Sequence, residues 1–327
     1  MWKRIVLSLL AVLILVAAAG FIYLSLKKPA SAPPSDLHVQ ATPQRLARGK
    51  YIFESLGDCD GCHSQRDFSR FNGPVVAGRS GSGAELSSFL IGMPGTVVAP
   101  NLTPDPETGL GAWTDGEKLR AIREGIGRDG RALFPMMPYA GFRNMSDEDA
   151  ECLIAYLDSL PPIRNPLPRT KLSFPVGLMI KGVPQPAGSV PPLDRFDRVR
   201  YGEKLVAIAS CGDCHTSMVR GQPDESKRFA GGRKFESKYG TVYTANITPD
   251  IETGIGKWDE EFFLKKFYDY KGYAEHGPPA VTGPEQFTVM PWLAFTQLTR
   301  EDLGAIYAYL RTVKPIKNAV ETHPKKS

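Results

Sequence analysis

The sequence contains one pattern of motifs twice, and this internal repeat predicts two similar domains in tandem rather than one large domain. At 327 residues the chain has room for two domains of ordinary size and some extensions. Each repeat has the same landmarks in the same order. They are a Cys-x-x-Cys-His pentapeptide (59–63 and 211–215), an Asn-Leu/Ile-Thr-Pro-Asp segment (101–105 and 246–250), a Met-Pro pair (137–138 and 290–291) and an Ala-Tyr-Leu segment (155–157 and 308–310).

The loops between these landmarks differ, although the overall spacing is nearly constant. The first repeat has a longer loop after His63, and the second has additional residues around 272–279. Because the lengths compensate, we expect the landmarks to meet in space while the loops stay free.

Helix signals surround the landmarks and predict a mainly α fold. Ser146 and Thr299 precede apolar stripes at helical spacing, each with an Asp three residues later, as in a capping box. Thr114 and Asp259 are expected to cap two shorter helices. No useful stretch alternates between polar and apolar residues, so we expect no long strand.

The composition is that of a globular protein, with 42% hydrophobic and 23% charged residues. The formal net charge is only +5, and no dense Lys/Arg block is present. Nucleic acid is therefore not an expected partner.

An uncharged N-terminal run, residues 5–26, is long enough to cross a bilayer. We predict a transmembrane anchor; a signal peptide cleaved after the small residues 17–19 is the alternative. Both interpretations export the remainder of the chain. The predicted organisation is an anchor (5–26), a flexible linker (29–44), domain 1 (45–162), a Pro-rich linker (163–194), domain 2 (195–318) and a basic tail (319–327).

The Pro-rich linker contains an apolar piece at 174–180 that is too hydrophobic for free coil. We expect it to pack partly on the protein surface. The alternative is contact with the membrane or with a partner.

The repeated pentapeptide indicates covalently bound haem, one group for each copy. Two thiols three positions apart reach the two vinyl groups of one porphyrin, and the next residue offers its imidazole to the iron. The predicted haem-attaching residues are Cys59 and Cys62 with the iron ligand His63, and Cys211 and Cys214 with the iron ligand His215. A redox dithiol or a zinc site is the alternative for an isolated Cys-x-x-Cys.

Methionines in the Met-Pro pairs are the predicted distal iron ligands, Met137 for the first haem and Met290 for the second. Aligning the repeats places Met136 opposite Val289, so Met136 is not expected to be the ligand. Proline after the ligand stiffens the loop. The alternatives are that both are core methionines, or that Met93 or His276 is the ligand in its repeat.

The order of these landmarks resembles the class I cytochrome c domain, twice, over about residues 45–315. The Asn-Leu/Ile-Thr-Pro-Asp-x-Glu-Thr-Gly segment with its following Trp resembles more closely the multihaem cytochrome c subunits of membrane-bound alcohol and gluconate dehydrogenases. This resemblance implies two tandem class I cytochrome c domains.

The resemblance also implies roles for residues outside the haem motifs. Gly49 and Gly202 would let the first and last helices of each domain cross closely, near Tyr156 and Tyr309. Trp113 and Trp258 would donate their indole N–H groups to haem propionates, or would simply be core residues. Backbone carbonyls near Pro100 and Ala245 would accept from Nδ1 of His63 and His215.

The remaining candidate residues have structural interpretations. Cys152 corresponds to Ala305 and is expected to be a buried, inert thiol. The carboxylate pairs Asp105/Glu107 and Asp250/Glu252 are expected to hold turns rather than a metal.

The expected function is electron transfer, because two filled iron sites leave no position for substrate. The expected partners are a periplasmic or membrane dehydrogenase, with quinol or an oxidase as further redox partners. The expected location is the inner membrane, with a single span and the haem domains on the periplasmic side. The alternative is a dihaem enzyme, such as a peroxidase or a thiosulfate-oxidising cytochrome.

Overall fold

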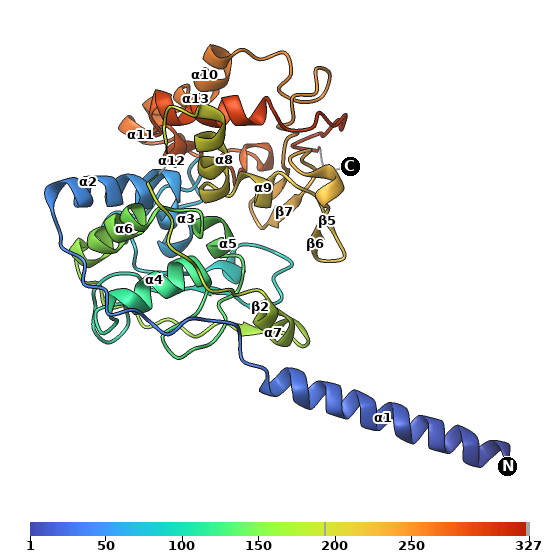
Figure 1. Ribbon diagram of the computed structural model, residues 1–327. Coiled ribbons are helices and arrows are strands. Elements are labelled where there is room, and N and C mark those ends of the chain that lie inside the picture. Colours follow the sequence, from blue (N-terminus) through green and yellow to red (C-terminus); the bar gives the residue numbers. More distant parts are fainter. Residues whose placement is uncertain (193, 325–327) are drawn as a thin grey trace.

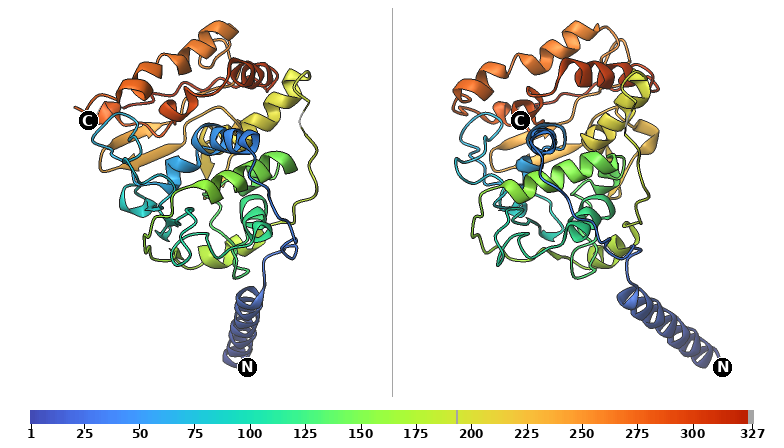
Figure 2. Two further views of the ribbon diagram at one scale, coloured as in Figure 1. Left: turned by 90° about the vertical axis from the view of Figure 1, so that its left-hand side faces the viewer. Right: turned by 60° about the vertical axis from the view of Figure 1, so that its left-hand side comes forward.

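A computed structural model describes residues 1–192 and 194–324 of the chain. Two mainly helical domains lie side by side, and helix α1 (Trp2–Leu26) projects away from them beside the first (Figures 1 and 2). Residues 325–327, the end of the predicted basic tail, lie outside the described residues, as does residue 193 of the predicted linker.

The two domains share a series of helices, to which domain 2 adds α11 (Lys271–His276). In domain 1 the helices are α2 (Pro43–Tyr51), continued by a π turn η1 (Ile52–Leu56), α3 (Cys59–His63), α4 (Asp115–Glu124), α5 (Tyr139–Phe142) and α6 (Asp147–Ser159). In domain 2 they are α8 (Arg198–Ile208), α9 (Cys211–Cys214), α10 (Glu260–Tyr268), α11, α12 (Trp292–Phe295) and α13 (Arg300–Leu310).

Four short antiparallel strand pairs complete the fold. They are β1 (Ala84–Glu85) with β3 (Val98–Ala99), β2 (Gly95–Thr96) with β4 (Lys171–Leu172), β5 (Met218–Val219) with β6 (Gln222–Pro223), and β7 (Lys234–Ser237) with β8 (Gly240–Tyr243). Short helical turns lie at η2 (Leu86–Ser88), α7 (Val176–Met179), η3 (Ile180–Gly182), η4 (Glu225–Lys227) and η5 (Pro284–Gln286). The mainly α prediction is confirmed; strands this short carry no alternating pattern that a sequence could show.

The predicted helix starts are confirmed. Thr114 and Glu117 form a reciprocal capping box at the start of α4, and Asp259 accepts from the backbone N–H of Phe262 at the start of α10. Ser146 caps α6 in the same way. These caps satisfy N–H groups that the first turn of a helix otherwise leaves unpaired.

Glycine permits the close crossing of the first and last helices in each domain, as predicted. A Cβ atom at Gly49 would lie 2.0 Å from the carbonyl oxygen of Cys152 and 2.6 Å from the Cβ of Tyr156. At Gly202 it would lie 1.8 Å from the carbonyl oxygen of Ala305. The crossings α2/α6 and α8/α13 therefore have no room for any side chain at these positions.

The expectation that the variable loops stay free is wrong, because they bind each other across the domain interface. The longer loop of domain 1 places Phe71 against Tyr270, with ring centroids 5.3 Å apart, and against Tyr273. The Phe71 N–H donates to the carbonyl of Pro279 at 2.8 Å. Packing the aromatic rings of the two loops together removes apolar area from water. This burial stabilises the packed arrangement relative to free loops.

The helices of the two domains also meet. Asp302, at the start of α13, is 1% exposed and accepts hydrogen bonds from the hydroxyls of Tyr201 in its own domain (2.7 Å) and Tyr51 of domain 1 (2.6 Å). Gly141 in α5 approaches the carbonyl of Ala207 in α8. The domains therefore form one packed unit.

The segments predicted as linkers lie along domain 1. The first was expected to be flexible, but the Val39 N–H donates to Asp115 at 2.8 Å and the Ala32 N–H to Glu124 at 3.2 Å. The second packs through the β2–β4 pair, as expected. In the described part of the C-terminal tail, the carbonyl of Thr322 accepts from the Tyr243 N–H, so this part packs on domain 2.

Candidate haem sites

Each Cys-x-x-Cys-His motif forms a single helical turn, entered through a residue with positive φ. Asp58 (φ 42°) precedes α3 and Ser210 (φ 56°) precedes α9. The reversal at these residues starts the turn abruptly. Both cysteines of a motif are free thiols on one turn, so they can form two thioether bonds to one group.

The two histidines have matching surroundings. Nδ1 of His63 donates to the carbonyl of Pro100 at 2.8 Å, and Nδ1 of His215 donates to the carbonyl of Ala245 at 2.7 Å. The predicted carbonyl partners are confirmed. A carbonyl can only accept, so the proton is fixed on Nδ1 and the lone pair of Nε2 is left for a metal.

Burial lowers the pKa of both imidazoles, and the bond to the carbonyl opposes this only in part. Both rings are therefore neutral at physiological pH, which is the form that binds metal ions. Among the described residues, neither Nε2 has a hydrogen-bond partner. These observations fit an iron ligand in each domain.

The thiols do not have the character of a redox dithiol. Burial raises the pKa of Cys62 and of Cys211 to about 12, and that of Cys214 to about 11. Reactive Cys-x-x-Cys pairs have lowered thiol pKa values instead. In residues 1–192 and 194–324, no three His, Cys, Asp or Glu side chains converge as a metal site.

The two Met-Pro segments have the same backbone geometry. Pro138 (φ −83°, ψ 51°) caps α5, and Pro291 (φ −78°, ψ 61°) caps α12. In each, the carbonyl of the preceding methionine accepts from the residue after the proline at 2.8 Å. The turns thus align Met137 with Met290, in the register that the repeat predicted.

The competing methionines belong to a different cluster from Met137 and Met290. Met136 and Met93 pack against the small cluster of Leu86, Val97 and Ala99, which Cys62 also contacts, whereas Met137 and Met290 pack against the large core. His276 is exposed, and its Nδ1 lies 3.2 Å from the carbonyl of Gly272 in its own helix.

Trp113 and Trp258 are half-buried against the large core of the protein. In the described part of the chain, neither indole N–H has a hydrogen-bond partner. Trp258 also packs edge-on against Phe262, with centroids 5.1 Å apart. Their packing suits core residues, and their unpaired N–H groups leave donors free for an anionic ligand group.

Asn72 is a residue near the second site that the sequence analysis missed. It is 4% exposed and lies in domain 1, yet its Nδ2 donates to the carbonyl of Met290 at 2.8 Å and its Oδ1 accepts from the Leu293 N–H at 3.0 Å. Its positive φ of 57° suits asparagine. The Asn-Gly pair 72–73 marks a turn, but no sequence signal identifies the partner.

The remaining candidates have structural roles, as expected. Asp105 accepts from Thr108, and Asp250 accepts from Thr253, through backbone N–H and hydroxyl in each case. Cys152 is 3% exposed, and burial with the neighbouring Glu148 raises its pKa to about 11.

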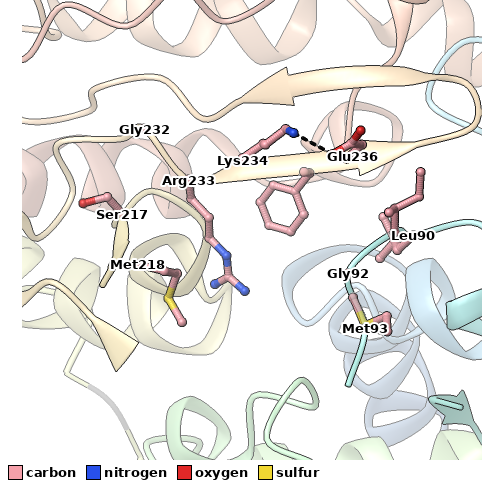
Figure 3. A pocket seen from close by; sticks show the side chains of 11 residues that line it. Leu90, Gly92, Met93, Ser217, Met218, Gly232, Arg233, Lys234 and Glu236 are labelled. Carbon is pink, nitrogen blue, oxygen red and sulfur yellow. Dashed lines mark hydrogen bonds and ion pairs between the residues drawn. The ribbon is translucent and has the colours of Figure 1, made fainter. Parts of the chain in front are cut away.

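A cavity of about 350 Å³ lies between the domains (Figure 3). Domain 1 lines it with Leu90 to Met93, and domain 2 lines it with Ser217, Met218 and the start of β7. Arg233 points into it (Figure 3). The cavity adjoins the residues that directly follow the second motif.

Comparison with known proteins agrees with this geometry. The family model described as Cytochrome c matches residues 46–161 and 199–314. A diheme cytochrome c-type protein of Cereibacter sphaeroides is 31% identical over 95% of this chain and 99% of its own length. The alcohol dehydrogenase (quinone) cytochrome c subunit of Komagataeibacter europaeus is 30% identical over 92% of this chain, and the fructose dehydrogenase cytochrome subunit of Gluconobacter japonicus is 30% identical over 88%.

The chain spans 61% of the length of the alcohol dehydrogenase subunit and 55% of the fructose dehydrogenase subunit. Two free cysteines on a turn, a neutral imidazole with a free Nε2 and a Met-Pro turn later in the chain are the features of a c-type haem domain, present twice. The chain belongs to the cytochrome c family, and it carries two covalently bound haem c groups. Electron transfer is the chemistry that this family membership supports.

Proposed function

We propose that this chain is a membrane-anchored dihaem relay that receives electrons from a dehydrogenase and passes them to a downstream acceptor. The observation that supports it best is the packing of the two domains against each other. Asn72 of domain 1 donates to the carbonyl of Met290 in domain 2 at 2.8 Å, and Tyr51 of domain 1 donates to Asp302 of domain 2 at 2.6 Å. Two redox groups held by these domains belong to one packed unit.

The proposed site residues follow the repeat. Cys59 and Cys62 attach the first haem, and Cys211 and Cys214 attach the second. Nε2 of His63 and of His215 would bind the iron of their haem, and the sulfur of Met137 and of Met290 would supply its second protein ligand. Trp113 and Trp258 donate to propionates. Haem iron ligated in this way alternates between the ferric and ferrous states, and methionine raises its potential.

Two filled coordination sites favour a relay over an enzyme. A peroxidase needs one iron with an open distal position, which predicts that the repeats differ at the distal turn. Instead, the Met137 and Met290 turns share their backbone geometry.

The proposed location is the inner membrane, with α1 as a single span and the haem domains on the periplasmic side. α1 is the one helix in the described residues that is long and apolar enough to cross a bilayer, with a mean hydropathy of 3.0 over its most apolar 18 residues. The named relatives include cytochrome subunits of alcohol and fructose dehydrogenases. They favour a dehydrogenase as the donor; quinol or an oxidase is the proposed further partner.

Anaerobic mixing of the full-length, detergent-solubilised protein with a reduced membrane dehydrogenase tests the relay. We expect both haems to become reduced, and then to be reoxidised by a terminal oxidase without peroxide turnover. Mass spectrometry of the same sample should show two attached haems. Rapid peroxide turnover, with stoichiometric cyanide binding at one ferric haem, would instead establish the enzyme alternative.

A further inference from the structure

An exposed apolar patch lies on the segment between the two domains. Phe174 is 74% exposed, Met179 is 61% exposed and Val183 is also exposed, although they belong to an ordered segment. The preceding strand β4 pairs with β2, and the Ser173 N–H donates to the carbonyl of Pro94 at 2.8 Å. These bonds fix the segment to domain 1 while it presents its largest side chains to the outside.

This patch adjoins the C-terminal end of α1 (Figures 1 and 2). The rings of Phe174 and Phe21 have centroids 6.1 Å apart. Lys181 Nζ donates to the carbonyls of Ser25 (2.7 Å) and Leu24 (3.3 Å), which lack partners within the last turn of α1. A cation at this end of a helix is also favoured by the helix dipole.

The contact between Phe174 and Phe21 determines how deep the patch lies relative to the bilayer. α1 has 25 residues and is therefore about 37 Å long, whereas the hydrocarbon core of a bilayer is about 30 Å thick. Phe21 lies about 7 Å along the axis before the helix ends at Leu26. When α1 spans the bilayer, Phe174 lies at the boundary between the lipid chains and the headgroups.

We propose that residues 173–183 form a membrane-docking surface that inserts Phe174, Met179 and Val183 into the lipid interface beside α1. This inference rests on the proposed membrane anchor. The docking surface holds domain 1 against the bilayer, so the haem domains have a fixed height and orientation instead of swinging on the anchor.

The charges around the patch favour a lipid headgroup layer over a protein partner. Lys27 and Lys28 follow α1 directly, and Lys181 binds its last turn. Apolar side chains beside lysines are typical of surfaces that bind anionic interfaces. The lysine stems can also extend along the lipid while the ammonium groups stay at the headgroups.

Spin labels in the full-length holoprotein, reconstituted in nanodiscs of phosphatidylcholine and phosphatidylglycerol, test the docking. Single labels are attached at Phe174→Cys, Met179→Cys, Leu13→Cys in α1, and Ile251→Cys. Ile251 is the matched control, because it is 62% exposed, apolar and in domain 2. The native Cys152 is buried and the motif thiols carry haem, so labelling is specific.

We expect labels 174 and 179 to be several-fold less accessible to a water-soluble Ni(II) chelate than label 251, and more accessible to oxygen. If they match label 251 while label 13 is shielded, the anchor stands and the docking surface is overturned. The patch would then be open to a protein partner. If label 13 is itself open to the chelate, the anchor and the docking surface both fail.

Discussion

The two domains share their helices and motifs but close the same helix crossing with different chemistry. In domain 1, the guanidinium of Arg48 forms two bonds with Asp149, at 2.7 and 2.8 Å. In domain 2, the corresponding residues are Tyr201 and Asp302, and the aspartate also binds Tyr51 of domain 1. The half-buried Arg48–Asp149 ion pair lies within domain 1, whereas the buried Asp302 of domain 2 also connects the two domains.

The Met-Pro turns of the two domains also differ in how directly the other domain holds them. The backbone of Met290 is held by Asn72 from the other domain. Near the turn of Met137, domain 2 contributes the bond from Lys204 Nζ to Asn144 Oδ1, at 2.9 Å, further along the chain. The second site thus depends directly on the first domain, and the first site depends less on the second.

The largest expected effect tests the alignment of the repeats at neighbouring methionines. Met137→Ala should abolish the sulfur-to-iron charge-transfer band at one haem, lower its potential and open it to added ligands, because the thioether is lost. Met136→Ala should keep the band and cost about 1–3 kcal/mol of stability, since this side chain fills an apolar cluster. Near-infrared spectra and redox titrations check both.

The opposite result, with the band lost in Met136→Ala and kept in Met137→Ala, would mean that the repeats are misaligned by one residue. If neither variant loses the band, Met93 is the next ligand to test.

Adding one methyl group at a helix crossing should destabilise either domain. Gly202→Ala should cost about 3 kcal/mol, and Gly49→Ala slightly less, because the new carbon would overlap a backbone carbonyl in both. Gly272→Ala, also in a helix but with open space around it, is the control and should be neutral or slightly stabilising. Urea unfolding measures all three, and equal effects at 49 and 272 would refute the close crossing in domain 1.

Removing the two matched aspartates compares the helix crossing of domain 2, where Asp302 also binds domain 1, with the crossing of domain 1, where Asp149 binds within its own domain. Asp302→Ala should cost about 2–3 kcal/mol, since two tyrosine hydroxyls lose their acceptor in a buried place. Asp149→Ala should cost about 1 kcal/mol, because its ion pair is partly open to water. Both residues lie in the first turn of a helix, so the dipole contribution is the same. Thermal unfolding of the two variants gives the comparison directly.

Asn72 tests whether the second haem site depends on the first domain. Asn72→Gly removes both hydrogen bonds but tolerates the positive φ, and should cost about 1–2 kcal/mol. It should weaken the charge-transfer band of the second haem and speed cyanide binding there. Asn144→Gly, at the interface beside the first site, should leave the second haem unaltered. A change confined to the first haem in Asn72→Gly would contradict the cross-domain role.

The smallest expected effect is a loss of folding stability at alkaline pH. Burial, together with the nearby Asp302, raises the pKa of Tyr201, while the tyrosine of the unfolded chain titrates near pH 10. The folded protein therefore keeps a proton that the unfolded chain loses, and stability should fall as the pH rises above about 10. Tyr201→Phe should make this decline shallower in urea titrations between about pH 9 and 11. An unchanged slope would show that Tyr201 does not contribute.

Local features were predictable from the sequence, whereas contacts between the repeats were not. The caps at Thr114 and Asp259 follow from nearby residues, whereas the glycines at the crossings and the carbonyl partners of the histidines follow from the resemblance to class I cytochrome c domains. Each of these features recurs in both domains, so one copy supports the other.

The contacts between the domains could not be predicted in this way, because they are made by the parts in which the two repeats differ. Nothing near Phe71 in the sequence indicates Tyr270 as its partner, and Asp302 was expected to complete a cap rather than to bind two tyrosines. The four-residue strands of the β7–β8 hairpin are likewise too short for a period to emerge.

The bond between Asn72 and Met290 has a consequence for assembly. Its two ends are 218 positions apart in the chain, with the asparagine in the half that is synthesised first. Domains generally fold as units, with the N-terminal one first during synthesis. The distal turn of the second domain is therefore completed on a template that already exists, so maturation has a built-in direction from the first domain to the second.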